Sequence, residues 1–160
     1  MNGINNLFVI EFENLMDQFG FYSAKEAVEI AKNFVNSNKI IYEPAIRWTK
    51  SSETIDLESK RCYTFSKNGQ ILSICMLHKA QRDPIGKQTD PYFVDCFYSI
   101  KDKKKRLLMK MIKYVMTQHE FSVQCECSNA IIDFEKCGCD IYHSQRGCNV
   151  VTIARTPDKK

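Results

Sequence analysis

The sequence predicts an α/β (α+β) fold, in which a mixed, mostly antiparallel central sheet is flanked by helices. Two segments, 23–38 and 103–120, carry apolar residues at helical spacing. The pair Asn68-Gly69 separates two β-rich runs, as in a tight hairpin. Beyond the hairpin, β-rich and helical segments alternate, which is typical of a sheet covered by helices. The 160 residues have the length of one domain, 1–160.

The first part of the chain contains one well-marked helix. Residues Asn6 to Phe12 are β-rich and predict an opening strand, and 13–20 predict a short helix closed by its glycine. In the segment 23–38, Ser23 and Glu26 form a capping box, in which each side chain satisfies an unpaired backbone N–H. The apolar residues that follow recur at helical spacing, so we expect this helix to bury one face.

The middle of the chain predicts a hairpin followed by a buried strand. Residues 61–77 read as two strands joined at Asn68-Gly69, the pair preferred where a two-residue turn needs positive φ. Residues 92–100 are apolar on both faces except for Asp95 and Ser99. A strand of this composition is expected near the centre of a sheet that is covered on both sides.

The last third predicts a helix, a strand, a short helix and one final strand. The helix lies within 103–120, and the alternation from Phe121 to Cys127 predicts the next strand. Ser128 or Asn129 caps the short helix, and Gly138 suits the left-handed position that follows a helix end. Residues 148–156 predict the closing strand.

Composition narrows the class of protein. Hydrophobic residues make up 44% and charged residues 26%, as in a globular protein. The net charge of +4 is a mild basic excess, well short of that of a dedicated nucleic-acid binder. No apolar run is long enough to span a bilayer, and the start lacks the features of a signal peptide. We therefore expect a cytoplasmic protein without a membrane partner, whose 8 cysteines are reduced thiols.

Potential metal ligands crowd the C-terminal part of the chain. They are Cys125, Cys127, Cys137, Cys139, His143 and Cys148. Zinc sites usually contain C-x₂₋₄-C pairs, whereas both pairs here are C-x-C, and a strand separates such sulfurs by about 7 Å. The pattern favours small buried hydrophobes over a zinc site, so no metal is predicted. A cysteine nucleophile served by His78, His119 or His143 has no motif to support it.

The short helix carries the most specific family signal. Its pattern is an Asn, a small residue, an aliphatic residue, an aromatic residue, Glu-Lys and Gly-Phe. The matching positions are Asn129, Ala130, Ile131 or Ile132, Phe134, Glu135, Lys136, Gly138 and Cys139. Through this pattern, and through the order of elements from Tyr92 to Arg155, the chain resembles the GNAT superfamily of CoA-dependent N-acyltransferases. Over residues 1–60 the resemblance rests on element order alone.

The resemblance implies a wedge between two neighbouring strands. In that family the central strand and the next strand separate, and the pantetheine arm of acetyl-CoA, the cosubstrate, lies between them. The pyrophosphate binds at the start of the following helix, where backbone N–H groups and the helix dipole favour an anion. An amine acceptor, which the sequence does not identify, then attacks the thioester. The cofactor-binding residues that this implies are Phe97, Tyr98, Ser99, Lys103, Lys104, Lys105, Arg106, Asn129 and Phe134.

Two departures from the family pattern bear on function. No glycine lies between Gly86 and Gly138, although the family's phosphate turn is glycine-rich; the basic run 101–106 stands in its place. Phe134 occupies the position where the family often uses a tyrosine to protonate the leaving thiolate, and it has no proton to give.

Two carboxylates are candidate general bases, by analogy with the proton acceptor that amine acylation requires. Asp95 lies on the predicted central strand, where burial would suit such a role, and Glu126 lies on the neighbouring strand. The other interpretation of Asp95 is a structural carboxylate bonded to a nearby Lys or Arg.

Three functions therefore remain open from the sequence. The favoured one is an N-acetyltransferase acting on a primary amine. The second is a catalytically inactive binding module of the same fold, which contacts a polyanion such as nucleic acid through the run Lys101 to Arg106; nucleic acid is the less favoured partner. The third is a zinc-bound interaction domain. The oligomeric state is not predicted.

Overall fold

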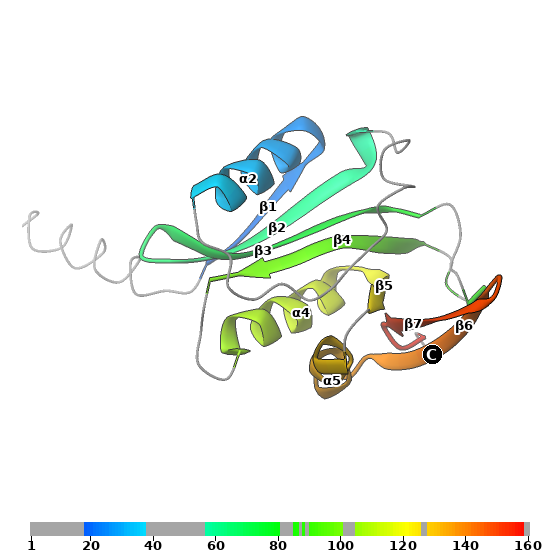
Figure 1. The fold of residues 1–160 in the computed structure, drawn as a ribbon. Helices are drawn as coiled ribbons and strands as arrows, with labels where there is room; N and C mark the ends of the chain where they lie inside the picture. Colours follow the sequence, from blue (N-terminus) through cyan, green and yellow to red (C-terminus); the bar gives the residue numbers. More distant parts are fainter. Residues whose placement is uncertain are drawn as a thin grey trace, which may run out of the picture.

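The computed structural model describes most of the chain as a sheet with helices on both faces (Figure 1). The described residues are 18–37, 57–80, 85–86, 88, 90–100, 105–125 and 128–158. The strand predicted at Asn6 to Phe12 lies outside them. No described helix is long and apolar enough to cross a membrane.

The described strands form one seven-stranded sheet in the order β1-β2-β3-β4-β5-β7-β6. The strands are β1 (Gln18–Ser23), β2 (Lys60–Lys67), β3 (Gln70–Lys79), β4 (Pro91–Ser99), β5 (Glu120–Cys125), β6 (Asp140–Arg146) and β7 (Asn149–Arg155). All neighbouring pairs are antiparallel except β4 and β5, which are parallel. The predicted mixed, mostly antiparallel sheet is therefore confirmed.

Helices cover the two faces unequally (Figure 1). Helix α2 (Ala24–Ser37) packs on one face of β1 to β3, and α4 (Arg106–Gln118) and α5 (Ser128–Lys136) lie on the other. A single turn of 3₁₀-helix, η1 (Leu57–Ser59), precedes β2. The larger core lies on the side of α4 and α5, and a smaller one lies under α2 around Ala27 and Phe34.

Local sequence signals account for most of these elements. Asn68 and Gly69 have φ values of 54° and 77°, as the turn between β2 and β3 requires. Gly138 has a φ of 100° directly after α5, and the N–H of Cys139 donates to the carbonyl of Phe134 across the helix end.

Two predictions about elements were wrong. Gly20 does not close a helix but lies inside β1, where a Cβ would come within 2.5 Å of Thr64 Oγ1. Glycine is needed there because the neighbouring strand approaches so closely. The chain also ends in a hairpin of two strands, β6 and β7, turning at Gly147 with a φ of 61°, rather than in one strand.

Candidate functional site

The parallel strands β4 and β5 separate soon after they begin. In the described residues they pair at three positions, and the last pair is Phe93 with Ser122. Beyond it, β4 stays paired with β3 as far as Ser99, whereas β5 pairs with β7 as far as Cys125. In Figure 1, β5 turns away from β4 toward α5. The sheet therefore divides into two parts that join near Phe93 and Ser122, a place that we call the apex.

Three aromatic rings fill one face of the apex. Phe97 of β4, Phe121 of β5 and Phe134 of α5 are fully or almost fully buried in the larger core. The ring of Phe97 lies 6.1 Å from that of Phe121 and 5.6 Å from that of Phe134, centroid to centroid. These contacts are those of a close-packed interior. The face on the side of α4 and α5 is therefore apolar and closed at the apex.

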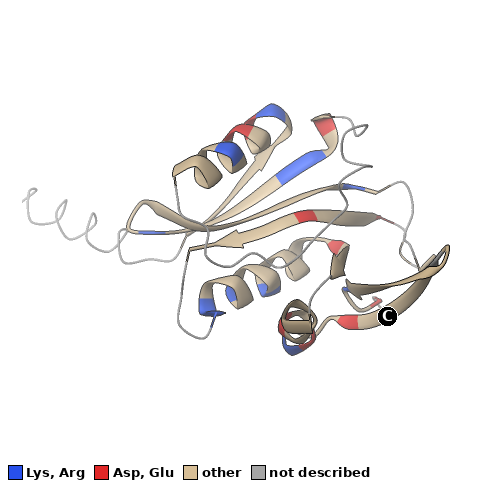
Figure 2. Cartoon of the chain, in the orientation of Figure 1, with Lys and Arg blue, Asp and Glu red and all other residues tan. Residues whose placement is uncertain are grey.

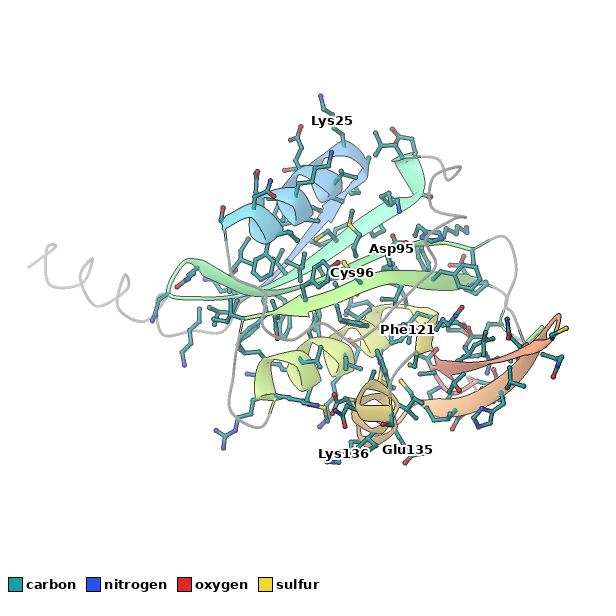
Figure 3. The ribbon with its side chains drawn as sticks, in the orientation of Figure 1. Lys25, Asp95, Cys96, Phe121, Glu135 and Lys136 are labelled. Carbon is teal, nitrogen blue, oxygen red and sulfur yellow. The ribbon has the colours of Figure 1, made fainter. Side chains whose placement is uncertain are left out.

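The other face of the apex carries charge. Asp95 is the extra residue of a β-bulge, because Met76 pairs with Cys96 whereas Leu77 pairs with Val94. Its Oδ2 accepts a hydrogen bond from Lys60 Nζ at 2.8 Å, and its Oδ1 lies 2.8 Å from His78 Nδ1. In Figure 3, Asp95 lies above β4 on the side of α2, and Phe121 lies below it.

The register of the strands places these groups next to the apex. Lys60 of β2 pairs with His78 of β3, and His78 pairs with Phe93 of β4. Directly paired residues have side chains on the same face, so His78, Phe93 and Ser122 form one row across three strands. His78 Nε2 and Ser122 Oγ are buried, and neither has a hydrogen-bond partner in the described part of the chain. Two buried polar atoms without hydrogen-bond partners in the described residues thus lie on either side of Phe93.

The end of the division opposite the apex, which we call the wide end, lies near the starts of two helices. The chain passes from the end of β4 toward the start of α4, and from the end of β5 toward the start of α5. Lys105, just before α4, has a φ of 55°, and its Nζ lies 3.1 Å from Asp133 Oδ2 of α5. This ion pair joins the first residues of α4 to the middle of α5. Helix starts present N–H groups, so the wide end suits an anion.

Comparison with solved structures identifies this architecture. The chain matches a ribosomal-protein-S18-alanine N-acetyltransferase from Escherichia coli with a TM-score of 0.56, at 10% identity over 91% of this chain and 97% of the other. It matches an IAA acetyltransferase from Bacillus cereus at 0.55, with 8% identity over 88% and 99%. It also matches a Bacillus subtilis acetyltransferase in complex with CoA at 0.51, with 11% identity over 86% and 97%.

This chain has the GNAT fold. No protein-family profile matches the sequence, and no curated protein sequence matches it. Agreement of the fold at such low identity makes this a divergent example of the GNAT fold, and the likeness itself shows the fold and nothing finer.

On the GNAT fold, the predicted site residues fall into two groups. Those on β4 line or approach the division: Tyr98 and Asp95 are partly buried, and Phe97 and Ser99 are buried. Those at the wide end are Arg106 and Asn129, both exposed near the helix starts, and Lys105, which is half-buried against Asp133. Lys103, Lys104 and Glu126 lie outside the described residues. Phe134 is a member of the closed apolar face.

Sequence reasoning missed the partners of Asp95. His78 was considered only as a helper of a cysteine, and Lys60 was not considered. The β3–β4 register and the bulge bring the three together, and no local pattern reveals either feature. The sequence also allowed Asp95 to be a structural carboxylate bonded to a nearby Lys or Arg. The observed contact with Lys60 is a bond of that kind.

The thiols do not gather around a metal in the described residues. No three His, Cys, Asp or Glu side chains there are placed to hold an ion, and Cys127 lies outside them. Burial raises the pKa of Cys62 and of Cys139 to about 12 and that of Cys137 to about 11. These groups are therefore neutral thiols near neutral pH, in keeping with small buried hydrophobes.

Proposed function

We propose that this protein is a CoA-dependent N-acyltransferase that moves an acetyl group from acetyl-CoA to a primary amine. The observation that carries the proposal is the division of the sheet, in which β4–β5 pairing ends at Phe93 and Ser122. The fold shared with acetyltransferases, one of them in complex with CoA, supports it.

The division offers a binding path for the cosubstrate. The pantetheine arm of acetyl-CoA would lie along β4 past Phe97, Tyr98 and Ser99, with its thioester at the apex. The diphosphate would lie at the wide end, near Arg106 and Asn129 and the basic run that includes Lys103 and Lys104. Arg106 and Asn129 are exposed there, at the first turns of α4 and α5, where N–H groups favour negative charge.

The reaction needs a nucleophile and a proton acceptor. The bound ammonium loses a proton, and the amine nitrogen then bonds to the thioester carbon as the carbon–sulfur bond breaks. Asp95 is a candidate proton acceptor because it lies beside the division, and Glu126, which follows β5 in the sequence, is the other candidate. Phe134 has no proton for the thiolate, so the leaving thiolate would depart unaided or take its proton from water or from the amine.

Calorimetry with acetyl-CoA tests the proposal. Wild-type protein is expected to bind, and the variant K103A/K104A/K105A is expected to bind at least about tenfold more weakly, because a hydrogen bond to a charged group is worth about 1.5–3 kcal/mol. The matched control is K25A/K32A/K67A, which removes three exposed lysines elsewhere. Absence of both heat and a shift in melting temperature at millimolar acetyl-CoA would count decisively against the transferase.

One observation favours a second function, binding of a polyanion. Helix α4 contains Arg106, Lys110 and Lys113 at spacings of 4 and 3, so they share one exposed face, and it contains no acidic residue. In Figure 2 this helix carries the blue of Lys and Arg and none of the red of Asp and Glu. Binding of a labelled single-stranded oligonucleotide should then weaken steeply with added salt. Binding that is absent, or that does not respond to salt, removes this alternative.

A further inference from the structure

The two faces of the apex differ in what they offer an amine acceptor. On the side of α4 and α5, the rings of Phe97, Phe121 and Phe134 close the core. An ammonium group entering there would be buried among hydrocarbon without a partner, which is costly. The opposite face carries Asp95, His78 and Ser122. An ammonium group is therefore better matched to the polar groups on the side of α2.

Asp95 is already engaged as an acceptor on that side. Lys60 Nζ lies 2.8 Å from its Oδ2, and His78 Nδ1 lies 2.8 Å from its Oδ1. An ionised carboxylate can only accept hydrogen bonds, so the nitrogen that faces it must carry the proton. The contact thus requires the N–H at Nδ1, and in the neutral ring this leaves the lone pair at Nε2.

The Nε2 atom of His78 has no hydrogen-bond partner in the described structure. The side chain is 1% exposed, and its ring packs edge-on against Phe93 at 5.8 Å. Buried polar atoms normally have partners, and one without a partner calls for an explanation. Phe93 is the residue at which β4 and β5 part. A carboxylate that orients an imidazole whose other nitrogen meets the substrate is a recurrent arrangement for moving protons.

We infer that Nε2 of His78 accepts the proton of the acceptor ammonium, with Asp95 holding the ring in place. The inference rests on the proposed function. The ammonium gives one proton to Nε2 and becomes a neutral amine. Its nitrogen bonds to the thioester carbon, the carbon–sulfur bond breaks, and the thiolate takes the second proton of that nitrogen. The proton on His78 then passes to solvent, so the products are an amide, CoA thiol and one released proton.

The groups around His78 are compatible with this role. On its face, β2 contributes Lys60 and Cys62, β4 contributes Asp95 and Cys96, and β5 contributes Ser122. The charged residues of α2 are exposed, as is Glu58 of η1. Lys60 and Asp95 neutralise each other at 2.8 Å, so no described charge lies unpaired beside the ring.

The tautomer is tested without substrate. Long-range ¹H–¹⁵N spectra of ¹⁵N-labelled protein distinguish the two neutral forms of histidine. We expect His78 in the Nδ1–H form, and we expect D95N to depopulate that form because the amide can also donate to Nδ1. Assignment comes from the loss of one ring signal in H78Q, and H143Q, at an exposed histidine, is the matched control. A wild-type ring in the Nε2–H form would overturn the inference.

The kinetic role is tested by thiol release from acetyl-CoA. The acceptors are a fixed panel: a diamine, an amino sugar, a lysine-containing peptide and a peptide with a free N-terminus. H78Q should lower kcat/KM by about 10²–10⁴-fold, the usual contribution of a general base. H143Q, which changes an exposed histidine, should keep the wild-type kcat/KM. D95N retains the imidazole, so its kcat/KM should lie between those of H78Q and wild type. This variant tests the same point if H78Q does not fold.

The outcomes separate the inference from the proposed function. If wild type is active and H78Q keeps the wild-type kcat/KM, the role of His78 is overturned and the transferase is left intact. A wild type that neither binds acetyl-CoA nor releases thiol with any panel amine overturns both.

Discussion

Lys60 Nζ lies 2.8 Å from Asp95 Oδ2, and the two side chains are only 13% and 15% exposed. The residues are 35 positions apart in the sequence and come from β2 and β4, which are not neighbours in the sheet. The bulge at Asp95 turns its side chain onto the face of Lys60 and His78, across β3. This ion pair therefore links β4, the strand at the apex, to β2 on the far side of β3.

Removing Lys60 should destabilise the fold. In K60M, Asp95 stays largely buried with its charge uncompensated, and a loss of about 3 kcal/mol in the free energy of unfolding is expected. K60M/D95N removes both charges, so it should recover part of that loss, with a coupling energy of about 1–3 kcal/mol. Urea unfolding of the four proteins measures the cycle. Additive effects of the two substitutions would show that the contact is not energetically coupled.

His119 should make stability depend on pH. Its Nε2 lies 2.7 Å from the hydroxyl of Tyr63, and burial lowers its pKa below the usual 6.5. The unfolded chain therefore binds this proton more readily than the folded one, so stability is full above about pH 6.5 and falls as the pH drops through the folded value. Urea unfolding at pH 7.5 and 5.5 should show a larger loss for wild type than for H119Q. An equal loss in both proteins contradicts the assignment.

Signals that act within a few residues were sufficient to predict much of the fold. The helices α2, α4 and α5 follow from apolar spacing, and the β2–β3 hairpin follows from Asn68-Gly69. The separation of β4 from β5 was expected from the family resemblance and appears in the strand pairing, but periodicity alone does not indicate it.

The remaining features depend on contacts between distant residues. β1 was missed because Gly20 reads as a helix stop, whereas it is required by the approach of Thr64 from β2. β6 was missed because its segment, DIYHSQR, has no apolar alternation, and it pairs with β7 only at the sheet edge. The cluster of Lys60, His78 and Asp95 depends on strand register, which a one-residue slip would destroy.

Thiol reactivity should single out one described cysteine. Cys148 is exposed at the turn between β6 and β7, whereas burial raises the pKa of Cys62 and Cys139 to about 12 and that of Cys75 well above its usual value. A neutral buried thiol reacts slowly because the thiolate is the nucleophile. Brief treatment of native protein with iodoacetamide, followed by peptide mapping, should modify Cys148 before these three. C148S is the control that removes the fast signal, and early labelling of Cys62, Cys75 or Cys139 would contradict their burial.

Phe134 tests whether the closed apolar face at the apex is structural. Its ring is fully buried and lies 5.6 Å from that of Phe97, so F134A should lower the free energy of unfolding by about 3–5 kcal/mol through lost contacts and a cavity. F134Y introduces the side chain that the resemblance to the GNAT superfamily implies at this position, but in this chain the added hydroxyl would meet a packed core. Burying it without a partner should cost about 1–3 kcal/mol.

The comparison of F134Y with F134L separates packing from chemistry. F134L keeps an apolar side chain, so it should be destabilised by loss of volume alone and should leave the pH dependence of thiol release as it is in wild type. If F134Y is as stable as wild type and turns over faster, the ring faces an open site, and the hydroxyl is protonating the leaving thiolate. A less stable F134Y without a gain in rate places Phe134 in the core, because its para position then has no water or substrate to contact.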